Sequence, residues 1–356
     1  MITSQKSGLH ILVFGAGAIG SYIGGSLSLH GHKVVFLERE SVAHLLRQRG
    51  ITLEIGNMEY HIPKVSVETS LEKILQEEPF DIAIFALKSY DTLAALETIK
   101  QFANILPPIL CLQNGVENEA ALASVLGIRN VIAGSVTTAI GRKESGAIVV
   151  ERMRGIGVAD DHNLSKLLVD AMNAANLNAC LYPIAADMKW SKMLTNLLAN
   201  ATSAILGMTP AEIFSNPQLY LLEVNQLREA IAVMASQGIH VIDLPKTPVR
   251  TLAFMVHSLP AFISRPLAAR ILGKGRGNKM PSFYIDLHSQ RGQSEVDYLN
   301  GAVARFGDRL GIPTPVNHIL TQILTGMTQG NISIDSYAHE TRKLVNALGA
   351  VSADKM

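Results

Sequence analysis

The sequence predicts an α/β protein in which an N-terminal doubly wound sheet is followed by an all-helical domain. A chain of 356 residues suits two domains better than one. Short apolar runs alternate with helical segments through the first half, the pattern of a sheet with helices on both faces. After Tyr182 and Pro183 this alternation stops and long helical stretches follow. We therefore expect domains over residues 1–183 and 184–356.

The first domain begins with a strand, a turn, a helix and a second parallel strand. The apolar run HILVF predicts a short buried strand, and small and apolar residues at helical spacing predict a helix from Ala18 to His30. Gly31 can end that helix, and KVVFL returns as a strand. Three further strands are predicted at DIAIFAL, PPILCLQ and NVIAGSV. This order is typical of a nucleotide-binding sheet.

The turn after the first strand has the glycine spacing of a dinucleotide site. Its residues are Gly15, Ala16, Gly17, Ala18, Ile19 and Gly20. Gly15 permits the tight turn, Gly17 lets the backbone approach a pyrophosphate, and Gly20 lets the helix pack on the strand. The N–H groups at the helix start can then bind the anion. Glycines also serve ordinary turns, but the position between a strand and a helix favours the cofactor.

Two charged residues end the second strand, where the adenosine ribose is recognised. Glu38 can accept hydrogen bonds from a ribose 2′-hydroxyl, as in NAD sites, whereas Arg39 can pair with a 2′-phosphate. The alternative is a solvated turn in which only one of them touches the ligand. Because a carboxylate can swing away from a phosphate, we expect NADP, with NAD the second choice.

Composition excludes several classes of partner. Lys and Arg number 31 against 30 Asp and Glu, so no strong field attracts nucleic acid or an anionic membrane. The uncharged stretch from Met193 to Ala211 contains too many amides and hydroxyls for a good membrane span. No histidine or cysteine spacing indicates a metal site. The two cysteines, Cys111 and Cys180, are too few for a disulfide framework, and with no signal-like N-terminus we expect a cytoplasmic protein.

The helical domain carries the candidate chemistry. Lys192, Asn196 and Asn200 follow one another at intervals of four residues, which places one cation and two amides along one face of a helix. Such a stripe is costly to bury without partners, so it faces water, a ligand or a partner helix in a hydrogen-bond ladder. An ammonium positioned there can stabilise the negative charge that develops on a carbonyl oxygen during reduction, and then donate a proton.

A second polar position lies near the end of the chain. Ser294 is expected to cap a helix that Glu295 opens. Taken alone, Glu295 is explained by the preference of carboxylates for helix N-termini.

Five motifs follow one another along the chain: GAGAIG, ALKSYDT, LQNGVENE, KMLTNLLAN and PSFYIDLHSQRGQSEVDYLNG. Together they make the chain resemble the ketopantoate (2-dehydropantoate 2-) reductase family over nearly its whole length. The resemblance implies a Rossmann-type first domain and a second domain like the C-terminal domain of 6-phosphogluconate dehydrogenase. It also implies NADPH-dependent reduction of ketopantoate to pantoate, in pantothenate (vitamin B5) biosynthesis.

The same resemblance implies roles for individual residues. Lys192 resembles the general acid, and Glu295 the carboxylate that orients the substrate. The substrate-binding groups are Asn196, Asn200 and Ser282, with Ser282 near the substrate carboxylate. Asn114 and Lys88 would line the nicotinamide end of the cofactor site, Asn114 bonding ribose or substrate, although Lys88 is equally explained as a surface lysine that closes a strand.

Residues at about 243–280 form an insertion relative to that family. The segment predicts an extra helical hairpin with a basic, glycine-rich end, for which a solvated loop is a simpler explanation than an anion site. The basic residues are Arg270, Lys274, Arg276 and Lys279. An exposed apolar hairpin is unusual in a monomer, which leaves a homodimer open. The insertion also leaves open a related reductase of another 2-oxo acid, and a non-catalytic NADP-binding sensor is the third hypothesis.

Overall fold

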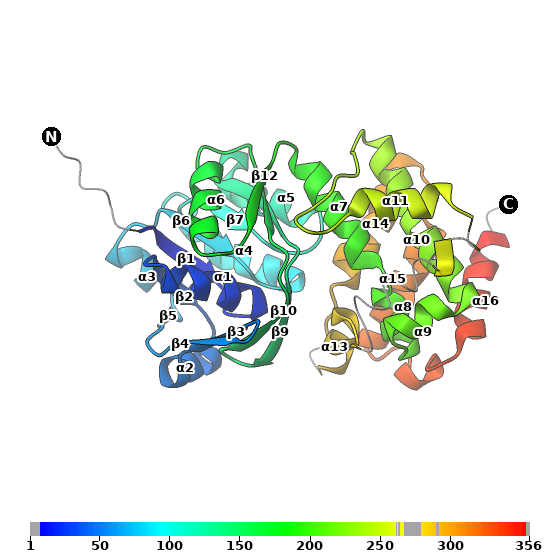
Figure 1. The fold of residues 1–356 in the computed structure, drawn as a ribbon, viewed down its shortest axis with the longest axis horizontal. Coiled ribbons are helices and arrows are strands. Elements are labelled where there is room, and N and C mark those ends of the chain that lie inside the picture. Colours follow the sequence, from blue (N-terminus) through cyan, green and yellow to red (C-terminus); the bar gives the residue numbers. More distant parts are fainter. Residues whose placement is uncertain (1–7, 261, 263, 267–278, 290–291, 354–356) are drawn as a thin grey trace. The chain divides into compact units, whose positions relative to one another are not determined.

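The structure is a computed structural model (Figure 1). It describes residues 8–260, 262, 264–266, 279–289 and 292–353. Contacts divide the chain into two units: Met1–Lys189 with Leu244–Thr247, and Trp190–Asp243 with Pro248–Met356. The division therefore follows Lys189, inside the helix α7 (Ala185–Leu197), instead of residue 183. The side chain of Lys189 is also bound by groups of the first unit.

The first unit contains an eight-stranded sheet. In spatial order its strands are β12 (Ala179–Tyr182), β11 (Ile156–Ala159), β8 (Val131–Val136), β7 (Ile109–Cys111), β6 (Ile82–Phe85), β1 (His10–Phe14), β2 (Lys33–Leu37) and β5 (Ser66–Glu68). The six strands from β8 to β5 are parallel, and β11 pairs antiparallel with β8. The strand order reverses between β1 and β6, the point at which doubly wound sheets bind ligands. The expected fold class is confirmed.

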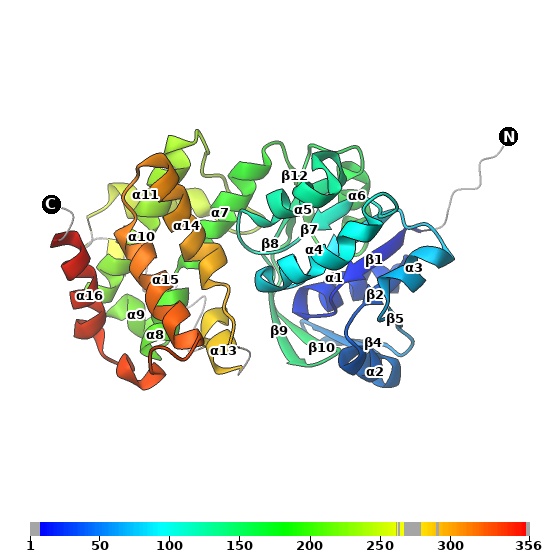
Figure 2. The same cartoon turned by 180° about the vertical axis from the view of Figure 1, so that it is seen from behind.

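Helices cover both faces of this sheet. They are α1 (Ala18–Leu29), α2 (Glu40–Arg49), α3 (Leu71–Glu77), α4 (Thr92–Ile99), α5 (Asn118–Leu126) and α6 (Ser165–Ala174), with 3₁₀ turns η1 (Ser89–Asp91), η2 (Lys100–Phe102) and η3 (Ile128–Asn130). In β1, Ile11 and Val13 belong to one hydrophobic core, which includes residues of α1 and α6. Leu12 and Phe14 belong to a second core, which includes residues of α3, α4 and α5. Figure 1 shows α1 and α6 in front of the sheet, and Figure 2 shows α3, α4 and α5 from behind. Alternation along a single buried strand thus supplies two cores.

A second, four-stranded sheet was not predicted. Its strands, in spatial order, are β4 (Met58–Ile62), β3 (Ile51–Ile55), β10 (Ala147–Arg152) and β9 (Ala139–Glu144). It joins the core on the α1 side through Leu53 and Ile148. A methyl group on Gly25 of α1 would come within 3.1 Å of Leu53, so this glycine allows the close approach. Its two antiparallel pairs are local, but the central pairing of β3 with β10 joins strands some ninety residues apart in sequence, which no local pattern reveals.

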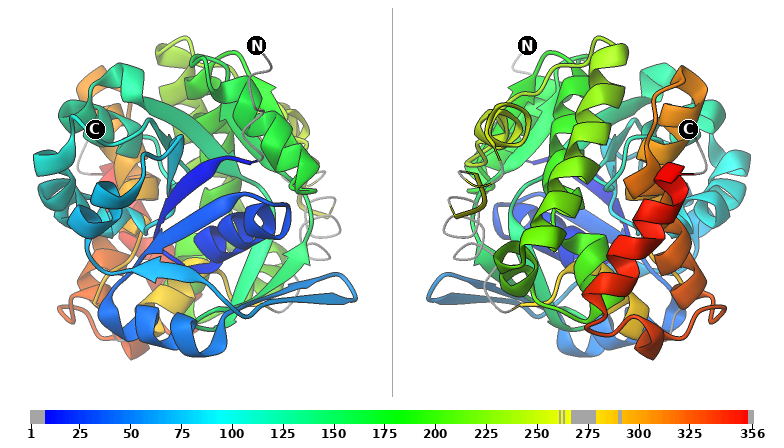
Figure 3. Two further views of the ribbon diagram at one scale, coloured as in Figure 1. Left: turned by 90° about the vertical axis from the view of Figure 1, so that its left-hand side faces the viewer. Right: turned by 90° about the vertical axis from the view of Figure 1, so that its right-hand side faces the viewer.

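Among the residues described, the regular secondary structure of the second unit is all helical. Its helices are α7, α8 (Asn200–Leu206), α9 (Pro210–Ser215), α10 (Pro217–Ser236), α11 (Val249–Ser258), α13 (Ser282–His288), α14 (Val296–Leu310), α15 (Pro315–Thr328) and α16 (Thr341–Ala353), with a 3₁₀ turn η4 (Ile334–Ser336). The last helix, red in Figure 3, packs against α10 and α15. Within the described ranges, no helix has the length and apolarity needed to cross a membrane.

The helix that carries the polar stripe is broken, contrary to expectation. Instead of continuing through Asn200, α7 ends at Leu197 and α8 begins at Asn200, with Ala199 left-handed (φ 49°) between them. Two side chains of α10 bind the backbone groups at the break. Glu223 accepts the Ala199 N–H at 2.7 Å, and Gln226 donates to the Leu197 carbonyl at 3.1 Å. Tertiary hydrogen bonds therefore override the helical preference of this segment.

The insertion is described only in part. Leu244 and Thr247 form a β-bridge and group with the first unit, and α11 follows. The remainder of the expected hairpin includes residues 267–278, which lie outside the described ranges together with Arg270, Lys274 and Arg276.

Candidate active site

The glycine turn lies where the strand order of the large sheet reverses. Gly15 has a φ of 91°, and its N–H donates to the Leu37 carbonyl at 3.1 Å. A Cβ on Gly15 would come within 2.8 Å of Leu87, just after β6, so the turn is packed between the ends of β1, β2 and β6. A Cβ on Gly20 would lie 1.9 Å from the Gly15 carbonyl oxygen. Both glycines are therefore required by the turn itself.

Gly17 differs from its neighbours because its surroundings are open. A Cβ built on Gly17 meets no described atom within 4 Å, although the residue starts α1. Among the described residues no side chain caps this helix end. Space and helix N–H donors at one place suit the pyrophosphate of a dinucleotide. The predicted residues, with Ala16, Ala18 and Ile19 between the glycines, thus fit that group.

Glu38 and Arg39, the two candidates for binding the adenosine ribose, have different surroundings. Glu38 Oε1 accepts the Ala16 N–H at 2.6 Å, and Oε2 accepts the Arg39 N–H at 3.1 Å. Arg39 is exposed and starts α2. The carboxylate is therefore held against the glycine turn, a contact that the sequence did not reveal.

Hydrogen bonds join the segments that contain Lys88 and Asn114. The Asn114 carbonyl accepts from Ser89 Oγ at 2.9 Å and from Asn118 Nδ2 at 2.6 Å. Gln113 Nε2 donates to the Lys88 carbonyl at 3.1 Å. Both Lys88 and Asn114 are half-buried. These loops follow β6 and β7, so the structure places both predicted residues at the carboxyl edge of the sheet.

A buried ion pair near this edge was missed by sequence reasoning. Lys189 lies 2.7 Å from Glu119 Oε1, and it donates to the Gln113 carbonyl at 2.7 Å. The lysine side chain is only 6% exposed. Its one signal in the sequence is its position three residues before Lys192, which puts a second lysine on almost the same face of the helix. Nearby, complete burial and Glu119 raise the pKa of the Cys111 thiol well above its usual value, so this cysteine stays protonated.

In the second unit, four predicted residues form a connected group. Lys192 Nζ donates to Asn196 Oδ1 at 2.8 Å. Asn200 Nδ2 donates to the Asn196 carbonyl at 3.1 Å and to Ser282 Oγ at 3.3 Å. Asn200 Oδ1 accepts the backbone N–H of Phe283 at 3.0 Å. The polar stripe is thus kept across the helix break and extends onto α13. Its bonds to α13 are hydrogen bonds between helices, the alternative to a ligand site that the sequence left open.

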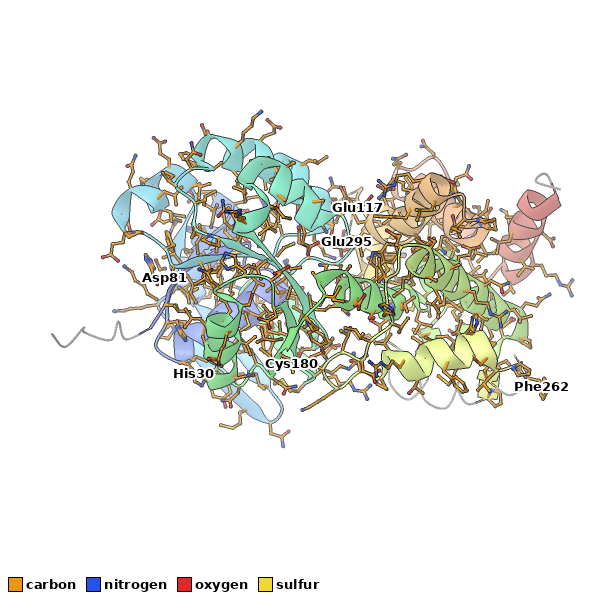
Figure 4. All side chains as sticks on the ribbon, turned by 90° about the horizontal axis from the view of Figure 1, so that it is seen from above. His30, Asp81, Glu117, Cys180, Phe262 and Glu295 are labelled. Atoms are coloured by element: carbon orange, nitrogen blue, oxygen red, sulfur yellow. The ribbon has the colours of Figure 1, made fainter. Side chains whose placement is uncertain are left out.

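Glu295 occupies the N-cap position of α14 and is 2% exposed (Figure 4). The helix itself begins at Val296, one residue later than expected. Ser294 Oγ accepts the Val296 N–H at 3.2 Å, so the serine, not the carboxylate, caps the first turn. Capping therefore does not account for the glutamate. In the part of the chain that the structure describes, no group of His, Cys, Asp and Glu could hold a metal ion.

A dinucleotide-type turn in a doubly wound sheet, followed by a helical unit with an aligned lysine and two amides, defines the class as a two-domain oxidoreductase. Residues 11–160 match the family described as "Ketopantoate reductase PanE/ApbA", and residues 185–328 match "Ketopantoate reductase PanE/ApbA C terminal". The chain therefore belongs to the ketopantoate reductase family.

Individual relatives agree with this assignment. The chain is 27% identical to the 2-dehydropantoate 2-reductase of Archaeoglobus fulgidus, over 90% of this chain and 98% of the relative. A crystal structure of a PanE/ApbA family ketopantoate reductase from Ralstonia eutropha JMP134 has a TM-score of 0.75 and 26% identity, covering 90% of this chain and 98% of that one. D-mandelate dehydrogenase with NADH and anilino(oxo)acetate shares the fold, with a TM-score of 0.73 and 21% identity, over 91% and 99% of the two chains.

Proposed function

We propose that the protein reduces ketopantoate (2-dehydropantoate) to pantoate with NADPH, a step of pantothenate biosynthesis, in the cytoplasm. The observation that carries the proposal is the connected group of Lys192, Asn196, Asn200 and Ser282 in a chain that belongs to this family. A cation aligned with two amides and a hydroxyl suits a small substrate with a carbonyl, a carboxylate and a hydroxyl group.

The cofactor would lie on the first unit. The turn from Gly15 to Gly20 would hold its pyrophosphate, Arg39 its 2′-phosphate, and Lys88 and Asn114 its nicotinamide end. When bound, the nicotinamide supplies the hydride for the substrate C2 carbon. NAD is the alternative cofactor. It is favoured by the Glu38 carboxylate at the turn, where a ribose 2′-hydroxyl could donate to it.

Lys192 would supply the proton. Asn196 fixes the ammonium by accepting one of its hydrogen bonds, so that another N–H can be aimed at the substrate oxygen. As negative charge develops on that oxygen, the ammonium stabilises it and donates a proton. Glu295 would hold the substrate hydroxyl and favour the charged form of the lysine, since an opposite charge nearby favours ionisation. Asn200 and Ser282 would bind the carboxylate end of the substrate.

A second candidate is reduction of another 2-oxo acid. The insertion at about 243–280 favours it, because additional residues precede Ser282 of the substrate group. The solved D-mandelate dehydrogenase complex shows that this fold also accommodates an aromatic oxo acid in that protein. A non-catalytic sensor is a weaker candidate, since a sensor needs no proton donor. We also propose a homodimer, which the apolar insertion left open, and sedimentation velocity tests it.

The test measures oxidation of NADPH and NADH by absorbance with ketopantoate and a panel of other 2-oxo acids. Turnover of ketopantoate should fall by about 100- to 10,000-fold in Lys192→Met, because general-acid catalysis is lost. Lys166→Met is the matched control, as this exposed lysine pairs with Asp170 on α6. Turnover of a different oxo acid alone supports the second candidate. Cofactor binding without any turnover supports the sensor.

A further inference from the structure

We infer that Glu223, which lies on α10, is a positioning residue that sets the orientation of Asn200 through the break between α7 and α8. The inference rests on the proposed function for its kinetic consequence, but its structural part stands on the contacts alone.

The backbone is strained at the break between α7 and α8. Ala199 adopts φ 49° and ψ 20° and is completely buried. A left-handed conformation costs a non-glycine residue free energy, and alanine has the strongest preference for continuing a helix. The surroundings must therefore stabilise the break. The other left-handed residue at an end of α8, Gly207, is a glycine and needs no such support.

The carboxylate of Glu223 stabilises this break. Glu223 Oε2 accepts the Ala199 N–H at 2.7 Å and Gln226 Nε2 at 3.0 Å, while Oε1 accepts Thr202 Oγ1 at 2.5 Å. Glu223 is 1% exposed and Gln226 is fully buried. One carboxylate thus binds the residue at the break and the first turn of α8. Since buried N–H and O–H groups are costly to leave unpaired, removal of this acceptor favours a different backbone conformation.

The break also determines where the Asn200 side chain binds. In a continuous helix the Asn196 carbonyl would receive the backbone N–H of Asn200, four residues on. Here it receives the side-chain amide of Asn200 at 3.1 Å, while Asn200 Oδ1 accepts the Phe283 N–H. If Ala199 returned to a helical conformation, Asn200 would rotate and lose its bonds to α13. Glu223 therefore controls the orientation of the Asn200 side chain through the backbone at the break.

The test uses two variants that differ in hydrogen-bonding capacity. Glu223→Met removes the acceptors and nearly keeps the volume. Glu223→Gln retains an oxygen for the Ala199 N–H, and its amide can donate to the Thr202 hydroxyl. Hydrogen–deuterium exchange is measured over Ser282–His288, and the KM for the oxo acid is measured beside the Kd for NADPH.

For Glu223→Met we expect faster exchange over Ser282–His288, a KM raised about tenfold by the loss of one well-placed hydrogen bond, and an unchanged Kd for NADPH. Glu223→Gln should resemble the wild type. A purely local structural role would accelerate exchange in α8 alone. Unchanged exchange over α13, or an unchanged KM, in folded Glu223→Met overturns the inference.

If the wild type turns over no 2-oxo acid, the proposed function fails, and the exchange of α13 alone decides whether Glu223 positions Asn200. If Glu223→Met does not fold, Glu223→Asp replaces it: the shortened carboxylate cannot reach both Ala199 and Thr202, and the same shift in exchange is expected. Met234→Ala, which opens a cavity in the core near the end of α10, controls for lost stability. An equal rise in KM in that variant overturns the inference.

Discussion

The contribution of Glu229 to the stability of the helical unit should fall as pH rises through about 6. This carboxylate, on α10, accepts the Val316 N–H at 2.8 Å and the Asn317 N–H at 2.9 Å, and so binds the start of α15 from outside the helix. Burial raises its pKa from 4.5 to about 6, against the lowering effect of these hydrogen bonds. Desolvation therefore outweighs the donors.

Proton linkage determines the direction in which the contribution of Glu229 to stability changes with pH. Because the folded-state pKa is higher than the unfolded-state pKa, the folded protein binds more protons between pH 4.5 and 6. The contribution of Glu229 to stability is complete below pH 4.5 and is lost as pH rises through about 6. One pKa unit corresponds to about 1.4 kcal/mol, so this shift amounts to about 2 kcal/mol.

The assay is urea unfolding from pH 4 to pH 7 of the wild type and Glu229→Gln. Fluorescence of Trp190, the single tryptophan, reports on the helical unit because its ring packs edge-on against Phe306 at 5.2 Å. At pH 4 residue 229 is neutral in both folded proteins, and only Glu229 ionises as pH rises. The stability of the wild type relative to the variant should therefore fall by about 2 kcal/mol towards pH 7. A difference that stays constant with pH would refute the reasoning.

Three other predictions concern the first unit. Gly17→Ala should leave thermal stability unchanged but weaken NADPH binding at least tenfold in a titration. Gly20→Ala should instead lower the melting temperature, because its methyl group would overlap a backbone carbonyl. Equal melting temperatures of the two variants would contradict the assignment of these two glycines. Glu38→Gln should raise the ratio of kcat/KM for NADPH to that for NADH, since it removes a negative charge from the turn; an unchanged ratio would show that Glu38 does not face the 2′ position. Lys189→Met should lower the free energy of unfolding in urea by about 3 kcal/mol, because it leaves Glu119 buried without its cation. Adding Glu119→Gln should recover part of this loss, and a double-mutant cycle measures the recovery.

The sequence by itself determined those features whose physical cause is local. The run HILVF, the glycines at 15, 17 and 20 and the return strand KVVFL predicted β1, α1 and β2 with nearly correct limits. Their apolar periodicity and turn chemistry act within some thirty residues. The spacing of four residues also brought Lys192 and Asn196 together as predicted, because that spacing is a property of the helix itself.

Only the tertiary structure decided the features that depend on distant partners. The four-stranded sheet joins β3 to β10, and the ion pair of Lys189 joins α7 to Glu119. The helix break at Ala199 depends on Glu223, twenty-four residues later, so the segment's own preference for helix predicted the wrong conformation there. Buried polar groups take whichever partner the fold places beside them, and a single sequence records the groups but not their pairing.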